Sequence, residues 1–381
     1  MLQAYCRCRL ALRGWASGMA AQRASGVAIP TEPIGSIPRP RVLIEAARAF
    51  QAGRISQAQL QSHYETAVQD TVARLEAAGS PVVTDGEQGK ESFATYPIRG
   101  LSNIAANGIP ILFADGHVRQ FPRLTQGPFR YRIPADAYLD TAQRYAHVPV
   151  KQAVASPSAL SLLYPQGGIT GYSRDEYFEE LLSEQEGEIK RCLDKDAHVV
   201  QIDFTEARLS LRLDPTGQLL SSFIELTNLL LERFSAEQRQ RIGIHTCAGS
   251  DRNSTHSRDV DYAALLPSLF ELKATNFYVQ LASEPDREHA LKTIRKFMKP
   301  DQCIFVGVIN VMDPRIETPD EVRDRVLQAA KHIPLEQLGT TDDCGFAPFS
   351  DDTSRSRDTA FAKIRSRVAG TLLAAKVLGL D

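Results

Sequence analysis

His245 and Cys247 are the residues of this sequence whose types and spacing point most directly to metal chemistry. They end an apolar run at 241–247, and residues i and i+2 of a strand project to the same face. Imidazole nitrogen and thiolate sulfur are both ligands of tetrahedral zinc, and a third candidate, Cys344, lies in a polar segment at 342–345. Three protein ligands and an open position describe a catalytic zinc site. The plainer interpretation is a hydrogen-bonded histidine among buried thiols.

Two acidic residues, Glu87 and Asp203, also follow predicted strands. The first ends the segment Asp85-Gly86-Glu87, and the second ends Gln201-Ile202-Asp203. Either carboxylate could serve only to cap a loop. Their common place at the ends of strands nevertheless favours a shared site, since the carboxyl ends of strands carry the functional side chains of barrel enzymes.

The elements that must position these residues alternate along the chain. Short apolar runs predict strands at 28–36, 81–87, 149–155, 198–204, 241–247, 276–282, 303–310 and 338–344. Amphipathic stretches predict helices at 55–78, 174–194, 219–234, 262–272, 288–297, 319–331 and 359–378, with Ser173 as an N-cap. This order predicts an α/β fold of the (β/α)8 TIM-barrel type, with an inserted segment at 92–147 after strand two that could form a lid. A doubly wound sheet is the alternative, but no G-x-G-x-x-G turn follows the first run.

Composition narrows the class of protein. The chain has 381 residues, of which 43% are hydrophobic and 24% charged, with a net charge of −2. These values exclude a disordered chain and give no electrostatic case for nucleic acid. No apolar stretch is long enough for a membrane helix. Six cysteines are too few for a disulfide framework in a chain of this length.

The N-terminal residues differ from the rest. Residues 1–31 contain four arginines and no acidic residue before Glu32. Such a leader is typical of organellar targeting, and a start at Met19 is the alternative explanation. We therefore predict that 1–26 lie outside the fold and that 27–381 form one barrel domain. The predicted location is cytoplasmic, or mitochondrial or another organelle if the leader is a transit peptide.

Six short motifs resemble the catalytic C-terminal barrel of cobalamin-independent methionine synthase: Ile34-Gly35-Ser36, Asp85-Gly86-Glu87, Val200-Gln201-Ile202-Asp203, His245-x-Cys247, Asp313-Pro314-Arg315-Ile316 and Asp343-Cys344-Gly345. They follow the order and spacing of that family from about residue 29 to 378. The resemblance implies the same (β/α)8 barrel and a Zn²⁺ ion held by His245, Cys247 and Cys344. It also implies a site for an amino-acid thiol, with the carboxylate at Gly35 and Ser36.

The resemblance also implies that Glu87 and Asp203 face the ammonium group of the substrate and are the catalytic residues. The implied activity is transfer of a methyl or other alkyl group to a small-molecule thiol, with homocysteine giving methionine as the first choice. Zinc would replace the thiol proton, so that a thiolate exists at neutral pH and attacks the electrophilic carbon.

Three departures from the family bear on the donor. The family's further zinc ligand, a glutamate, aligns with Gln280, and Glu284 follows four residues later, so either could be a fourth ligand. A histidine near the departing folate aligns with Met312, which carries no proton to donate. The duplicated N-terminal barrel of the folate enzymes is also absent. These departures favour a donor other than folate, such as a corrinoid or another activated methyl donor.

Other functions remain open from the sequence. The related epoxyalkane:coenzyme M transferases use a similar zinc site, and their sulfonate substrate would need cationic anchors, for which Arg252, Arg39 and Arg315 are candidates. The related uroporphyrinogen decarboxylases need no metal, which would leave the three ligands unexplained. A barrel that keeps zinc only for stability is the alternative of a different class; zinc removal would melt it, whereas a catalytic site would lose activity with the fold intact.

Overall fold

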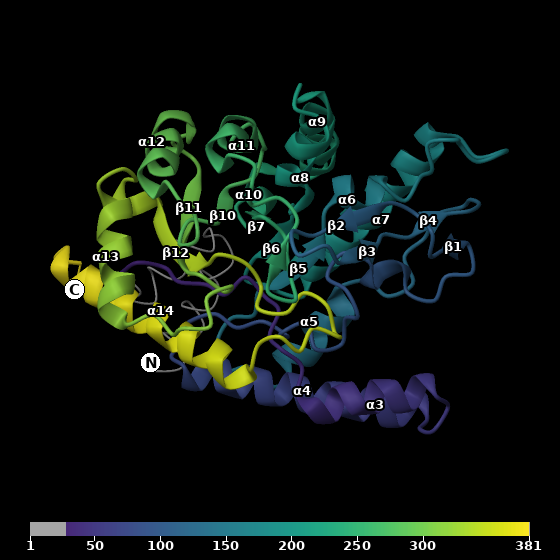
Figure 1. Cartoon of the computed structure of the whole chain (residues 1–381), viewed down its shortest axis with the longest axis horizontal. Helices are drawn as coiled ribbons and strands as arrows, with labels where there is room; N and C mark the ends of the chain where they lie inside the picture. The colour runs from purple at the N-terminus through teal and green to yellow at the C-terminus, as the bar shows by residue number, and fades with distance from the viewer. Residues whose placement is uncertain (1–27, 381) are drawn as a thin grey trace, which may run out of the picture.

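A curved sheet of parallel strands occupies the centre of the molecule, and helices surround it (Figure 1). The computed structural model describes residues 28–380, so the predicted leader at 1–26 lies outside the described residues. Six strands form a regular ladder in the order β12-β11-β10-β7-β6-β5. Their bounds are β5 Gln152–Ala155, β6 Val200–Asp203, β7 Ile242–Thr246, β10 Asn276–Val279, β11 Cys303–Ile309 and β12 Leu338–Asp342.

Two extended segments occupy the remaining positions between β12 and β5. Thr31 makes a parallel bridge to Thr340 of β12, and Val83 makes one to Val150 beside β5. The two segments meet where the Ile37 amide donates to the Gly86 carbonyl over 3.0 Å. The predicted barrel order is thus confirmed, with eight strand positions of which two are bridges and not regular strands. Pro30 and Pro33 lack the N–H groups that a regular ladder needs.

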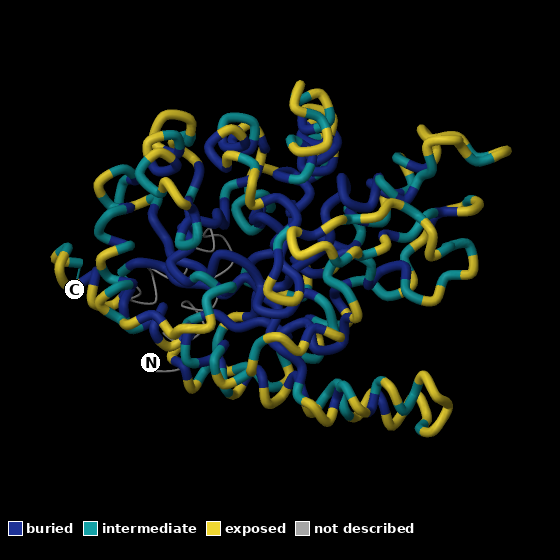
Figure 2. The backbone as a smooth tube through the Cα atoms, in the orientation of Figure 1, coloured by how far each residue is buried: buried dark blue, intermediate teal, exposed yellow. Residues whose placement is uncertain are grey.

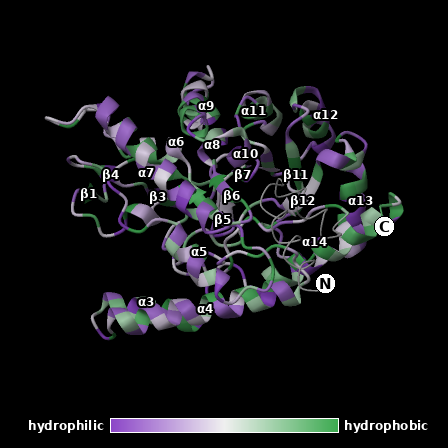
Figure 3. Cartoon of the chain, turned by 180° about the vertical axis from the view of Figure 1, so that it is seen from behind, coloured by the Kyte–Doolittle hydropathy of each residue, from purple (hydrophilic) through white to green (hydrophobic). Residues whose placement is uncertain are grey.

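The predicted helices are present around this ring. The capping box at Ser173, whose side chain accepts from the Glu176 amide, begins α7 where the sequence places it. The helices are α3 Arg41–Gln51, α4 Gln57–Ala77, α5 Asp136–Gln143, α6 Pro157–Ser161, α7 Arg174–Asp194, α8 Glu206–Leu213, α9 Gln218–Leu231, α10 Ala236–Arg239, α11 Tyr262–Leu269, α12 Arg287–Phe297, α13 Pro319–Ala330 and α14 Arg357–Val377, with 3₁₀ turns at Tyr96–Ile98 and Leu335–Gln337. The strands are buried and the helices expose one side (Figure 2), and hydrophilic and hydrophobic residues alternate along the helices (Figure 3). None of the helices in residues 28–380 is long and apolar enough to cross a membrane.

A charged cluster lies inside the ring of strands. The Glu32 carboxylate accepts from the Tyr278 hydroxyl over 2.6 Å and lies 3.1 Å from His198 Nε2. The Lys151 ammonium is 3.3 Å from the same carboxylate and lies over the Tyr278 ring, 3.7 Å from its centroid. Both charged side chains are fully buried. This cluster therefore joins the first segment to residues beside β5 and β6 and to β10, across the interior.

The inserted segment after the second strand position forms small elements at one edge of the molecule. It contains two antiparallel pairs, β1 Ile104–Ala105 with β4 Arg123–Leu124 and β2 Pro110–Leu112 with β3 Val118–Gln120, and it ends in α5. A further short pair, β8 Ser250–Asp251 with β9 Ser254–Thr255, follows β7. Figure 1 shows β1 and β4 at the periphery, whereas β2 and β3 lie nearer the central strands.

Candidate functional site

The three predicted metal ligands lie together. His245 is in β7, Cys247 follows that strand, and Cys344 follows β12, on the far side of β10 and β11. Their ligand atoms are all within 4.8 Å of one another, and the two sulfur atoms are 3.0 Å apart. All three side chains are buried. The alternation of β7 brings His245 and Cys247 to one face, and the curvature of the sheet brings Cys344 to them.

The surroundings of this cluster fit a bound cation. His245 Nδ1 lies 3.2 Å from the Tyr278 carbonyl oxygen, which orients the ring in the way that metal-binding histidines are held. Its Nε2 is buried and has no hydrogen-bond partner among residues 28–380. The Gly249 amide donates to Cys247 Sγ over 3.3 Å, a contact that favours a thiolate. A buried imidazole nitrogen without a partner beside two converging sulfur atoms is costly unless an ion binds them.

The two candidates for a fourth ligand, Gln280 and Glu284, make hydrogen bonds to other groups in this structure. Glu284 accepts from Arg208 Nη1 over 2.7 Å and from the Gln280 amide over 2.5 Å, and this buried ion pair holds its carboxylate. The Gln280 side-chain oxygen in turn accepts from the Ala248 amide over 2.8 Å. Arg208 thus binds the Glu284 carboxylate in this structure, and the ligand atoms that lie within 4.8 Å of one another are those of His245, Cys247 and Cys344.

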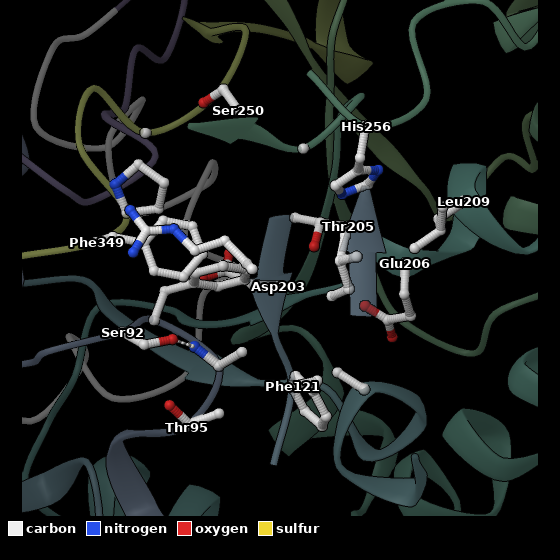
Figure 4. Close-up of a pocket in the computed structure, with 18 of the residues that line it drawn as sticks. Ser92, Thr95, Phe121, Asp203, Thr205, Glu206, Leu209, Ser250, His256 and Phe349 are labelled. Atoms are coloured by element: carbon white, nitrogen blue, oxygen red, sulfur yellow. Dashed lines mark hydrogen bonds between the residues drawn. The ribbon is translucent and has the colours of Figure 1, made fainter. Parts of the chain in front are cut away.

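The predicted substrate residues share one cavity with the cluster. The cavity has a volume of about 790 Å³. Its polar floor, as we call it, is formed by residues at or just after the ends of the strands: Gly35, Ser36, Glu87, Asp203, His245 and Cys344. Its apolar wall comes from the inserted segment and α8: Ile109, Ile111, Leu112, Phe113, Phe121 and Leu209. Figure 4 shows side chains from both parts, among them Asp203, Leu209 and Phe121.

Glu87 and Asp203 are both buried acids on this floor. Burial is the largest influence on each and raises both pKa values, and the nearby Asp203 carboxylate raises that of Glu87 further. The buried Lys90 ammonium, 3.4 Å from Glu87, opposes this rise, and the Gln201 amide donates to Asp203 over 2.7 Å. Two carboxyl groups in a dry cavity attract a cationic group strongly. The floor can therefore hold an ammonium group.

Ser36 and Gly35 lie where a carboxylate would face donors. Ser36 Oγ accepts from the Ala347 amide over 3.2 Å, which leaves its own hydroxyl proton free to donate. A Cβ atom at Gly345 would lie 2.1 Å from Ser36 Oγ, so only glycine fits beside Cys344. The floor thus places hydroxyl and acidic groups around the sulfur ligands.

Side-chain contacts hold the inserted segment against residues that follow β7 and β12. Arg119 of β3 donates from Nη2 to Asp251 over 3.0 Å and to Asp351 over 2.8 Å. His117 Nε2 lies 3.0 Å from Asp251, which is fully buried. The interpretation of the insert as a cover for the site agrees with these contacts.

The three arginines considered as sulfonate anchors lie elsewhere. Arg39 is buried and donates to the backbone oxygens of Glu87 and Lys90 over 2.6 and 2.9 Å. Arg252 pairs with Asp351 at 2.9 Å, and Arg315 pairs with Glu321 at 2.8 Å. None of these three arginines is among the described residues that line the cavity.

Sequence reasoning named Asp343 only within a motif, without a role, and missed Glu206. Asp343 accepts from the amides of Leu281, Ala282 and Ser283 over 3.0, 2.8 and 2.7 Å and so fixes the segment before Cys344. Glu206, at the start of α8, lines the cavity beside the wall. The only sequence signal for Glu206 is its place three residues after Asp203.

Comparisons with known proteins identify relatives that match nearly the whole chain. Residues 29–369 match the sequence model of the family described as Cobalamin-independent synthase, Catalytic domain. The methionine synthase of Sulfurisphaera tokodaii is 24% identical over 350 residues, which cover 90% of this chain and 91% of that protein. The methionine synthase of Sulfolobus acidocaldarius is 25% identical over 356 residues, or 91% and 92% of the two chains.

Solved structures show the same fold. The B12-independent methionine synthase from Shewanella sp. W3-18-1, in complex with selenomethionine, superposes with a TM-score of 0.73 at 19% identity, covering 92% of this chain and 98% of that one. A putative vitamin-B12-independent methionine synthase from Listeria monocytogenes gives 0.68 at 19% identity, covering 90% and 96%. The match over residues 29–369 shows that this chain belongs to the cobalamin-independent synthase family, in the part that forms its catalytic domain.

Proposed function

We propose that this chain is a zinc-dependent methyltransferase that transfers a methyl group to the sulfur of homocysteine and forms methionine. The observation that carries the proposal is the common floor on which Glu87 and Asp203 lie beside His245 and Cys344. The relatives named methionine synthase, which match nearly the whole chain, support it.

His245, Cys247 and Cys344 would hold the zinc ion. Bound zinc supplies a Lewis acid that keeps a substrate thiol as a thiolate at neutral pH. The chain itself contributes orientation: the Tyr278 carbonyl oxygen holds the imidazole, and the amide of Gly249 donates to Cys247. With no carboxylate ligand in the cluster, its three ligands carry one negative charge fewer than a set that includes glutamate.

Glu87 and Asp203 would bind the ammonium group of homocysteine, and Ser36 with the backbone at Gly35 would bind its carboxylate. The opposite charges of these two ends select an amino acid and aim its sulfur toward the cluster. Coenzyme M, with a sulfonate and no ammonium group, would meet two buried carboxyl groups here. The floor therefore favours homocysteine over coenzyme M.

The methyl donor in this proposal is not folate. Met312 occupies the position of the proton-donating histidine and lies outside the described lining of the cavity. The corrinoid donor expected from the sequence finds no support, because the family is described as cobalamin-independent. The residues that line the cavity indicate the chemical class of the donor more directly.

X-ray absorption at the zinc edge tests this function. The purified protein should show two sulfur ligands at rest, and homocysteine should add a third, whereas coenzyme M should not. The Cys344→Ser variant is the control: it should not retain zinc after dialysis and should therefore give no zinc–sulfur signal. A spectrum that homocysteine does not change would contradict the proposal and favour a structural zinc site, which can be recognised by melting of the fold on zinc removal.

A further inference from the structure

Glu206 is a buried acid of the cavity that the proposed function does not use. It is the first residue of α8 and is 6% exposed. One carboxyl oxygen, Oε1, accepts from the hydroxyl groups of Ser156 and Ser158, which follow β5. The other oxygen, Oε2, is buried and has no hydrogen-bond partner among residues 28–380. The carboxyl group is therefore fixed on one side and free to bond on the other.

The protonation state of this carboxyl follows from its surroundings. Burial is the largest influence on Glu206 and raises its pKa to about 7. The hydrogen bonds from the two serine hydroxyls lower the pKa, and the nearby Asp203 carboxylate raises it. A carboxylic acid with a pKa near neutrality can both hold and give up a proton at the pH of a cell. A buried polar atom without a partner is destabilising, so the unpaired Glu206 Oε2 points to a ligand that bonds to it.

The neighbours of Glu206 indicate what that ligand carries. Its carboxyl group lies in the region that Leu209 and Phe121 border, both of the apolar wall (Figure 4). The amino acid site is on the polar floor, so the wall faces the second substrate. A donor body that packs on these residues is apolar.

We propose that Glu206 donates a proton to the leaving atom of the alkyl donor, and that this donor has an apolar body and an oxygen or nitrogen leaving atom. The inference rests on the proposed function for its thiol acceptor. The bond from sulfur to carbon forms as the bond from carbon to the leaving atom breaks. The leaving atom takes the electron pair and the Glu206 proton. The carboxylate regains a proton from solvent, where the thiol released one on binding.

The test uses two alkylating probes on the zinc-loaded, homocysteine-bound protein. 1,2-Epoxyhexane has an apolar tail and an oxygen that must be protonated, whereas methyl iodide releases an ion that needs no proton. We expect Glu206→Gln to slow the reaction with 1,2-epoxyhexane by about 10²-fold or more and to leave the reaction with methyl iodide unchanged. The exposed Glu225→Gln variant on α9 is the matched control and should change neither rate.

The outcomes separate this inference from the proposed function. If the wild type fails to speed methylation of homocysteine even by methyl iodide, the proposed function is wrong. If it does so but does not consume 1,2-epoxyhexane, or if Glu206→Gln slows both probes equally, the inference about Glu206 and its donor is overturned.

A second readout does not depend on turnover. The infrared difference spectrum of wild type minus Glu206→Gln at pH 6 should contain the C=O band of a protonated carboxyl. Adding 1-hexanol, which offers an apolar body and an acceptor oxygen, should shift that band to lower frequency. A spectrum without the protonated band, or a band that 1-hexanol does not shift, overturns the inference.

Discussion

The buried Glu32–Lys151 pair gives the sharpest test of what holds the barrel together. Glu32 accepts from Tyr278, lies beside His198 and faces the Lys151 ammonium at 3.3 Å, with both charged side chains fully buried. Replacing Glu32 by glutamine would keep the volume and remove the charge. Lys151 would then lie in the interior without its counter-charge.

Two independent considerations give the size of the effect. These partners overcome burial and lower the pKa of Glu32 from 4.5 to about 2. A difference of that size corresponds to about 3 kcal/mol of stability. Removing one partner of a buried ion pair lowers the free energy of unfolding by about 3–5 kcal/mol in measured cases. We therefore expect Glu32→Gln to lower the free energy of unfolding by about 3–5 kcal/mol, or Tm by roughly 6–10 °C.

The pH dependence has a definite sign. Because the pKa of Glu32 is depressed in the folded state, its stabilisation is complete above about pH 4.5 and is lost as the pH falls toward about 2. The Tm difference between wild type and Glu32→Gln, followed by scanning calorimetry, should narrow over that range. Glu45→Gln, at an exposed pair with Arg41 on α3, is the control and should leave Tm unchanged.

A double variant completes the test. Lys151→Met in the Glu32→Gln background removes the unpaired ammonium and should recover much of the lost stability. A Glu32→Gln protein that melts within about 1 °C of wild type at pH 7, or a difference that does not narrow in acid, would refute the reasoning.

The remaining predictions concern the site. Cys247→Ser and Cys344→Ser should each abolish retention of zinc after dialysis, measured by metal analysis; full occupancy in either would remove the assignment of these ligands. Asp203→Asn should weaken homocysteine binding by roughly tenfold or more and coenzyme M binding hardly at all, measured by calorimetry, since only homocysteine has an ammonium group to lose its partner; equal effects would mean that the floor does not recognise an amino acid. Arg119→Met should free β3 from Asp251 and raise KM for the donor more than for the thiol in steady-state assays, while equal changes in both would show that the strand does not cover the donor.

Much of the barrel could be predicted because its signals are local. Apolar runs bounded by turns located β5, β6, β7, β10, β11 and β12, and the capping residues of α7 predicted its first residue. The two segments that close the ring were expected as strands but form single bridges, and in the first of them Pro30 and Pro33 lack the N–H groups of a regular ladder. The small strands of the insert have two or three residues each, too few for alternation to show in the sequence.

The site was predictable where strand alternation governs it and not elsewhere. Strand alternation alone predicts that His245 and Cys247 share a face. The contact with Cys344 depends on the curvature of the sheet, and it was predicted only from the family resemblance. The ion pair of Glu284 could not be predicted from the sequence, because its partner, Arg208, is 76 residues away in the chain. Glu206 escaped notice because an acid in the first turn of a helix is ordinary.

The layering of the cavity has a consequence for kinetics. In the proposed function the thiol binds on the floor at the strand ends, and the donor packs on the apolar wall, part of which belongs to the inserted segment that Arg119 ties to Asp251. A donor seated against the wall would block the way to the floor. We therefore expect a compulsory order, in which the thiol enters first and the thioether leaves last. Methionine should then inhibit competitively against homocysteine and non-competitively against the donor.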